Sequence, residues 1–78
     1  NKVIFFVIMK IRYSKHGLER LIQRNIPKEL IEEAIKLGHK TELELGKIKV
    51  RLRKRNKTLL VIYLPSVKFI KIITAYYL

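Results

Sequence analysis

The pattern of apolar and polar residues begins with a strand. Residues 3–13 are rich in β-branched and aromatic side chains, and from Lys10 to Tyr13 basic and apolar positions alternate, which is typical of a strand that leaves a core towards solvent. The apolar run at residues 3–9 is too short to span a membrane and lacks the small-residue cleavage site of a secretory signal. We therefore predict a first strand here, with residues 1–8 as a candidate extension of the domain.

The pattern becomes helical over residues 15–24. Leu18, Leu21 and Ile22 share one side of a helix that turns 100° per residue, so this side is expected to pack against a sheet. Ser14 stands before the first turn and is a favourable N-cap, because its hydroxyl can accept a hydrogen bond from an otherwise unpaired backbone N–H.

A second helix is predicted over residues 27–37. Asn25 is suited to the end of the first helix and Pro27 to the first turn of the second, so the two helices should meet at an elbow. Gly38 is a natural stop for the second helix. Its apolar positions at core spacing are Leu30, Ile31, Ala34 and Ile35.

Beyond Gly38 the period of the apolar positions changes to two, which indicates strands. Gly46 and Pro65 supply turns between them. The predicted strands are residues 39–45, 47–54, 59–64 and 67–77.

These elements predict an α+β fold in which a strand and two helices precede a three- or four-stranded antiparallel sheet. Both helices are expected on one face of the sheet. Residues 1–78 are expected to form a single domain, because the chain is short and shows no linker or repeat. The chain contains no cysteine, which excludes disulfides and thiolate metal sites and is compatible with the cytoplasm, the compartment we expect.

Charge then points to a polyanionic partner. The formal net charge is +12, and residues 45–78 hold nine lysines and arginines without a single acid. In residues 47–54 apolar positions alternate with a row of cations, which repel one another unless an anion lies along them. We expect this partner to be nucleic acid rather than a membrane or an acidic protein.

The polar side of the first helix carries candidate chemistry. His16, Arg20 and Arg24 lie opposite its apolar side, and we predict that all three are accessible to solvent. Such a side often only meets water, and Arg24 is also explained by the favourable effect of a cation near a helix C-terminus. The functional alternative is proton transfer and phosphate binding, because imidazole titrates near neutrality and guanidinium matches phosphate oxygens.

A family resemblance adds to this pattern. The segment SKHGLERLIQRNIP from Ser14 to Pro27, a second helix, a basic strand and the closing segment Ile72-Ile73-Thr74-Ala75-Tyr76 resemble the domain-of-unknown-function family 4258. That family has a His-x-x-Glu-Arg-x-x-x-Arg-x-Ile signature and a final strand with a Thr-x-Tyr type of pattern. The resemblance covers residues 9–77.

That family is allied with toxins of the RelE, ParE and BrnT types, small basic α+β proteins. Many of them cut mRNA on the ribosome and are silenced by an antitoxin, whereas ParE-type members act on gyrase. The resemblance thus implies a RelE-like fold and a metal-independent endoribonuclease, with RNA, including ribosome-bound mRNA, as substrate and an acidic antitoxin as partner. RelE-type enzymes carry catalytic residues on their C-terminal strands, and the positions that match here are Arg51, Arg53 and Tyr76.

Metal-free RNA cleavage requires a base for the 2′-hydroxyl proton, cations around the phosphate and an acid for the leaving oxygen. The candidate catalytic residues are His16, Arg20, Arg51 and Tyr76. The candidate nucleic-acid-binding residues are Arg24, Lys47, Lys49, Arg53, Lys54, Arg55 and Lys57. No metal or cofactor is expected, because the acids do not form the carboxylate cluster of a two-metal site. Two alternatives stay open: a non-catalytic nucleic-acid-binding module and a toxin-like protein that acts through protein–protein contacts.

Overall fold

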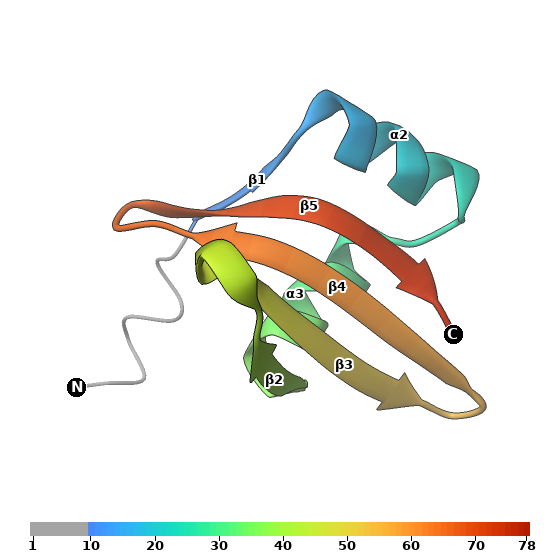
Figure 1. Cartoon of the computed structure of the whole chain (residues 1–78). Helices are drawn as coiled ribbons and strands as arrows, with labels where there is room; N and C mark the ends of the chain where they lie inside the picture. Colours follow the sequence, from blue (N-terminus) through green and yellow to red (C-terminus); the bar gives the residue numbers. More distant parts are fainter. Residues whose placement is uncertain (1–9) are drawn as a thin grey trace.

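A five-stranded sheet carries one helix on its face and a second helix along its edge (Figure 1). The computed structural model describes residues 10–78. The strands lie in the spatial order β1-β5-β4-β3-β2. In chain order the elements are β1 Lys10–Tyr13, α2 Lys15–Gln23, α3 Lys28–Leu37, β2 His39–Glu42, the 3₁₀ helix η1 Glu44–Gly46, β3 Ile48–Lys54, β4 Lys57–Pro65 and β5 Phe69–Tyr77.

The α+β class and the antiparallel run from β2 to β5 confirm the prediction, but the sheet is mixed. Strand β1 pairs in parallel with β5, from Lys10 opposite Phe69 to Tyr13 opposite Ile72. The four strands after the helices are thus the predicted antiparallel run, and the parallel pairing of β1 that makes the sheet five-stranded and mixed was not predicted, because periodicity locates a strand without naming its partner. The part of the predicted first strand before Lys10 lies outside the described residues.

Local capping sets both ends of α2. The Ser14 hydroxyl accepts a hydrogen bond from the Gly17 backbone N–H at 2.9 Å, as predicted for an N-cap. At the other end Asn25 adopts a left-handed φ of 59°, and the Ile26 N–H donates to the Leu21 carbonyl at 2.9 Å. This is the Schellman arrangement, in which a residue with positive φ ends the helix and the next apolar residue folds back on it.

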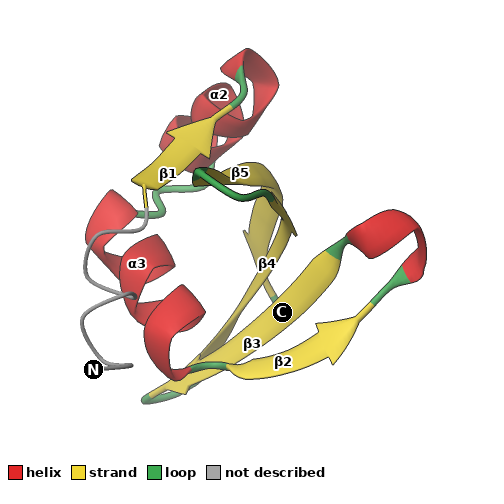
Figure 2. Cartoon of the chain, turned by 90° about the vertical axis from the view of Figure 1, so that its left-hand side faces the viewer, coloured by secondary structure: helices red, strands yellow, loops and turns green. Residues whose placement is uncertain are grey.

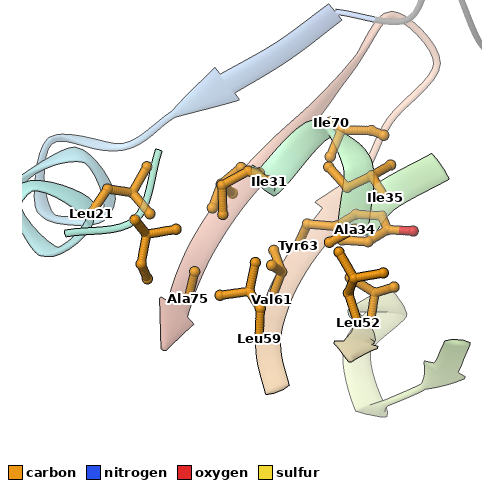
Figure 3. Packing of buried hydrophobic residues seen from close by; sticks show 13 residues of the cluster. Leu21, Ile31, Ala34, Ile35, Leu52, Leu59, Val61, Tyr63, Ile70 and Ala75 are labelled. Atoms are coloured by element: carbon orange, nitrogen blue, oxygen red, sulfur yellow. The ribbon is translucent and has the colours of Figure 1, made fainter. Parts of the chain in front are cut away.

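Helix α3 covers one face of the sheet, as Figure 2 shows from the side. Its core positions are those predicted, with Ile31 and Ala34 fully buried. They pack against the inward residues of β3, β4 and β5, and Figure 3 shows these side chains meeting between helix and sheet. Pro27 is the N-cap of α3 rather than part of its first turn, and Gly38 is the C-cap.

Helix α2 does not share that face. It lies along the edge of β5, beyond the end of β1 (Figure 1). A Cβ added to Gly17 would stand 3.3 Å from the Ile72 carbonyl oxygen, so the helix backbone lies directly against the strand. Only Leu21 reaches the core, whereas Ile22 is 73% exposed and Leu18 is also exposed. The prediction that both helices pack on one face was therefore wrong, and Ile22 is not packed as predicted, since a helix beside an edge is buried along a narrow line only.

Two of the later predicted strands are shorter than expected. Strand β2 ends at Glu42, after which η1 turns the chain with left-handed φ values of 62° at Leu45 and 76° at Gly46. Leu45 is 86% exposed, so its apolar character does not mark a buried strand position. The final strand begins at Phe69, not at residue 67.

Candidate nucleic-acid interface

The face of the sheet opposite α3 is not covered by a helix (Figure 2). We call this surface the open face. Its members face outward because side chains alternate along a strand, and no acidic residue lies among them. They include His39 and Thr41 from β2, Lys49, Arg51 and Arg53 from β3, Thr58, Leu60 and Ile62 from β4, and Thr74 and Tyr76 from β5.

A β-bulge places the last two of these residues on the open face. The register between β4 and β5 shifts at Ile62 and Tyr63, so that Tyr63 pairs with Ile72 but Ile62 pairs with Thr74. The buried positions of β5 accordingly change from even numbers before the bulge to odd numbers after it. Bulges of this kind redirect side chains, and without the shift Thr74 and Tyr76 would point towards α3.

One register row joins three of these residues. Arg51 pairs with Leu60, and Leu60 pairs with Tyr76 on its other side. Adjacent strands are about 4.8 Å apart, so the backbones of Arg51 and Tyr76 are about 10 Å apart. Leu60 between them is only 5% exposed although no helix lies above it, because cross-strand neighbours lie close enough to cover it. The row therefore presents a cation, an apolar floor and a phenol.

Arg24 adds a second cation at the Tyr76 end of the row. One guanidinium nitrogen, Nη1, donates a hydrogen bond to the Ala75 carbonyl at 2.8 Å, and the guanidinium carbon is 5.9 Å from the centre of the Tyr76 ring. This residue is half-buried at the C-cap of α2. Arg24 is therefore only partly accessible to solvent, less than was predicted, because the helix lies at the edge of β5, where the arginine can reach a strand carbonyl.

His16 and Arg20 are exposed on α2, as predicted. Counted at 100° per residue, they lie about 140° and 100° round the helix from the buried Leu21, on the side away from the core. Within residues 10–78 neither side chain makes a hydrogen bond or ion pair. The structure thus joins Arg24, Tyr76 and Arg51 through direct contact or register, and within residues 10–78 no side-chain hydrogen bond or ion pair joins His16 or Arg20 to them.

The remaining predicted binding residues divide between two sides of the sheet. Lys47 precedes β3 and is half-buried. At the β3–β4 hairpin, Lys54 turns towards α3 and its Nζ lies 2.6 and 2.8 Å from the two carboxylate oxygens of Glu33. Lys57 lies with its Nζ 5.0 Å from the centre of the Tyr77 ring. These hairpin cations do not continue the row of Lys49, Arg51 and Arg53.

Sequence reasoning missed His39, Leu60 and Thr74 as members of the surface and the structural role of Arg24. The consecutive apolar residues Ile72 and Ile73 are only a weak signal of the bulge, since Phe69 and Ile70 are also consecutive apolar residues. Arg24 leaves none, because a surface arginine and one bound to a distant carbonyl look identical in a sequence.

Residues 10–78 contain neither a cluster of metal ligands nor a helix that could span a membrane. In residues 10–78 no three histidine, aspartate or glutamate side chains come together as a ligand group. Among the helices of the same residues, none is long and apolar enough to cross a membrane.

A family model for a domain of unknown function, DUF4258, matches residues 13–77. The chain belongs to the DUF4258 family. This match runs from Tyr13, the last residue of β1, to the end of β5 and therefore includes both helices and the open face. No curated protein and no solved structure gives a significant match to the chain.

Proposed function

We propose that this DUF4258 protein binds RNA on the open face of its sheet and cleaves it there, as a toxin-type endoribonuclease of the RelE and BrnT kind. The observation that carries the proposal is the row of Arg51, Leu60 and Tyr76, extended by Arg24 on a surface without acids. Phosphates are expected to contact the cations of β3, and bases to lie against Leu60 and Tyr76. Such a combination of cations and aromatic or apolar surface is how sheets bind single strands.

The proposed cleavage is an internal transfer of the phosphate. The 2′-hydroxyl oxygen attacks phosphorus while the bond from phosphorus to the 5′ oxygen breaks, which leaves a 2′,3′-cyclic phosphate and a 5′-hydroxyl. His16 takes the 2′-hydroxyl proton, Arg51 and Arg20 hold the phosphate oxygens as charge develops, and Tyr76 gives a proton to the leaving oxygen. Arg24 positions Tyr76 through its contacts with the ring and with the neighbouring carbonyl.

Salt dependence tests the binding part. If three phosphates contact Lys49, Arg51 and Arg53, the logarithm of the affinity for single-stranded RNA should fall with the logarithm of salt with a slope of about −2. That slope corresponds to a loss of about 20-fold between 50 and 200 mM salt. Arg51→Ala should make the slope shallower by about 0.7. An affinity that does not change with salt would rule out this mode of binding.

Product mapping tests the chemistry. Purified protein is incubated with end-labelled RNA in EDTA, with and without ribosomes, and the products are expected to carry 2′,3′-cyclic phosphates. Tyr76→Phe should slow cleavage by about 10²- to 10⁴-fold at nearly unchanged affinity. Tyr13→Phe is the matched control, because it removes a phenol hydroxyl on the α3 side of the sheet, away from the row. Equal rates for the two variants would contradict the role of Tyr76.

A specific observation favours a second candidate, the non-catalytic RNA-binding module. His16 makes no hydrogen bond or ion pair with Arg51 or Tyr76 within residues 10–78, so the proposed proton acceptor is not held beside the row; the histidine that pairs with Arg51 in register is His39 of β2. Salt-dependent binding without cleavage, both with and without ribosomes, would establish this module and exclude the nuclease. The absence of RNA binding at low salt would favour a toxin that acts on a protein, with an acidic antitoxin as its regulator.

A further inference from the structure

A cleft lies on the α3 side of the sheet, between α3 and the β3–β4 hairpin. It encloses about 400 Å³, which is within the size range of small-ligand sites. Its walls are the apolar side chains of Leu30, Leu59 and Tyr77, and its rim includes Arg55, Asn56 and Lys57. Leu59 and Tyr77 belong to the α3 side of the sheet, because they alternate with the open-face residues Leu60 and Tyr76. The cleft is therefore separate from the row described above.

The charges at the cleft suit an anion. Lys54 is neutralised by Glu33, and this is the one ion pair within residues 10–78. Arg55 and Lys57 make no ion pair in the same residues, and Lys57 is held over the ring of Tyr77 at the cleft wall. Two cations thus stand at the mouth of a pocket whose interior is apolar, which matches a ligand with both a flat apolar part and a negative charge.

The backbone at the rim supports the same assignment. Arg55 adopts a φ of 56° in the two-residue turn between the paired residues Lys54 and Lys57. Glycine or asparagine is usual at such a φ, and a bulky residue there is strained. The strained residue is an exposed arginine at the mouth of the cleft, and strain of this kind is often found where a residue serves a ligand.

We propose that this cleft takes one unpaired nucleotide of the RNA that the open face binds, so that the protein recognises single-stranded RNA. The base lies against Leu30 and Tyr77, and its phosphate contacts Arg55 and Lys57. A strand can pass from one face to the other round the hairpin, because Arg53 lies on the open face beside the turn, Arg55 lies in the turn, and Lys57 lies at the cleft. A base held in a duplex cannot enter the cleft, whereas an unstacked base can. This inference rests on the proposed RNA binding and adds the class of substrate.

Two variants test it by fluorescence anisotropy with a 12-nucleotide single-stranded RNA and the matching duplex as probes. Tyr77→Leu keeps an apolar core residue but removes the ring, and should weaken single-strand binding by about 5- to 100-fold while leaving duplex binding unchanged. Arg55→Gly removes one cation and relieves the strained φ, so it should keep or raise the urea midpoint yet make the salt slope of single-strand binding shallower by about 0.7.

Matched controls exist at the other end of the molecule. Tyr13→Leu removes a ring that also holds a lysine, with the Lys28 Nζ 5.1 Å from its centre, and Lys68→Ala removes an exposed cation from the β4–β5 turn. Neither should change single-strand affinity more than about twofold, since neither residue lines the cleft.

The outcomes separate this inference from the proposed function. Loss of single-strand affinity in Tyr77→Leu and Arg55→Gly, with intact controls, supports the cleft. Wild-type affinity in both variants, while Arg51→Ala still weakens RNA binding, overturns the cleft and leaves the open face standing. Equal losses for single strand and duplex in Tyr77→Leu also overturn it, because the ring then does not distinguish an unpaired base. If the wild-type protein binds neither probe at low salt, the proposed function itself fails.

Discussion

Replacing Arg24 by alanine should destabilise the protein far more than replacing the other arginine of α2. The Arg24 side chain lies against the edge of β5 beyond the end of β1. Its guanidinium donates a hydrogen bond to the Ala75 carbonyl at 2.8 Å, and the guanidinium carbon is 5.9 Å from the centre of the Tyr76 ring. A hydrogen bond from a charged donor contributes about 1.5 to 3 kcal/mol, and a half-exposed cation–π contact about 0.5 kcal/mol. We expect Arg24→Ala to lower the free energy of unfolding by about 2 to 3 kcal/mol.

The assay is urea or thermal unfolding followed by circular dichroism. For a domain of this size the expected loss lowers the midpoint temperature by roughly 8 to 20 °C. Arg24→Lys should recover part of the loss, because an ammonium group can donate to one carbonyl but lacks the planar fork. In a double-mutant cycle with Tyr76→Leu, the coupling energy should be about 0.5 kcal/mol.

Arg20→Ala provides the control. Arg20 is exposed one turn earlier on the same helix, so its removal should change stability by less than about 0.5 kcal/mol. If the two substitutions have the same effect on stability, the hydrogen bond from Arg24 to the Ala75 carbonyl does not stabilise the packing of α2 on β5.

Three further predictions concern other parts of the fold. Gly38→Ala should cost about 1 to 3 kcal/mol in urea unfolding, because the new Cβ would lie 2.6 Å from the Ala34 carbonyl oxygen; wild-type stability would show that α3 shifts freely. Burial raises the pKa of the Tyr63 phenol above 10.0, so the folded state keeps a proton that the unfolded state loses. The resulting stability is complete below pH 10 and falls above it, and a pH series of urea midpoints should show a shallower fall in Tyr63→Phe. Leu45→Gly should raise stability by up to about 1 kcal/mol, since Leu45 is exposed at a φ of 62°; a clear loss would mean that its side chain has a packing role.

The predictable part of the fold is the part in which one face of an element is buried. Helix α3 and strand β3 each bury one side and expose the other. The spacing of their apolar residues therefore predicted both the kind of element and the side that faces the core. Leu45 misled the same reasoning, because an apolar side chain in a turn has no partner to bury it. The position of α2 could not be predicted either, since a helix beside a sheet edge needs only Gly17 and Leu21 as buried residues.

The candidate site was harder to predict because it depends on which strands pair and in which register, and the spacing of apolar residues along the sequence does not show this. Arg51 and Tyr76 are far apart in the sequence and share a row only through their common neighbour Leu60. Tyr76 faces that row only because of the bulge opposite Ile62, which changes the face of every later residue in β5. A reader of the sequence can list the cations and tyrosines, but the register decides which of them meet.

The helix motif of the family divides into two parts in this structure. Arg24 and Ile26 have structural explanations, since one binds a strand carbonyl and the other is buried in the cap that ends α2. His16, Glu19 and Arg20 are exposed and make no side-chain hydrogen bond or ion pair within residues 10–78. The fold thus accounts for the end of the motif but not for its beginning. Any role of the three exposed residues would act on something that binds to α2, and the RNA that we propose for the open face would lie beside Arg24 at the end of the same helix.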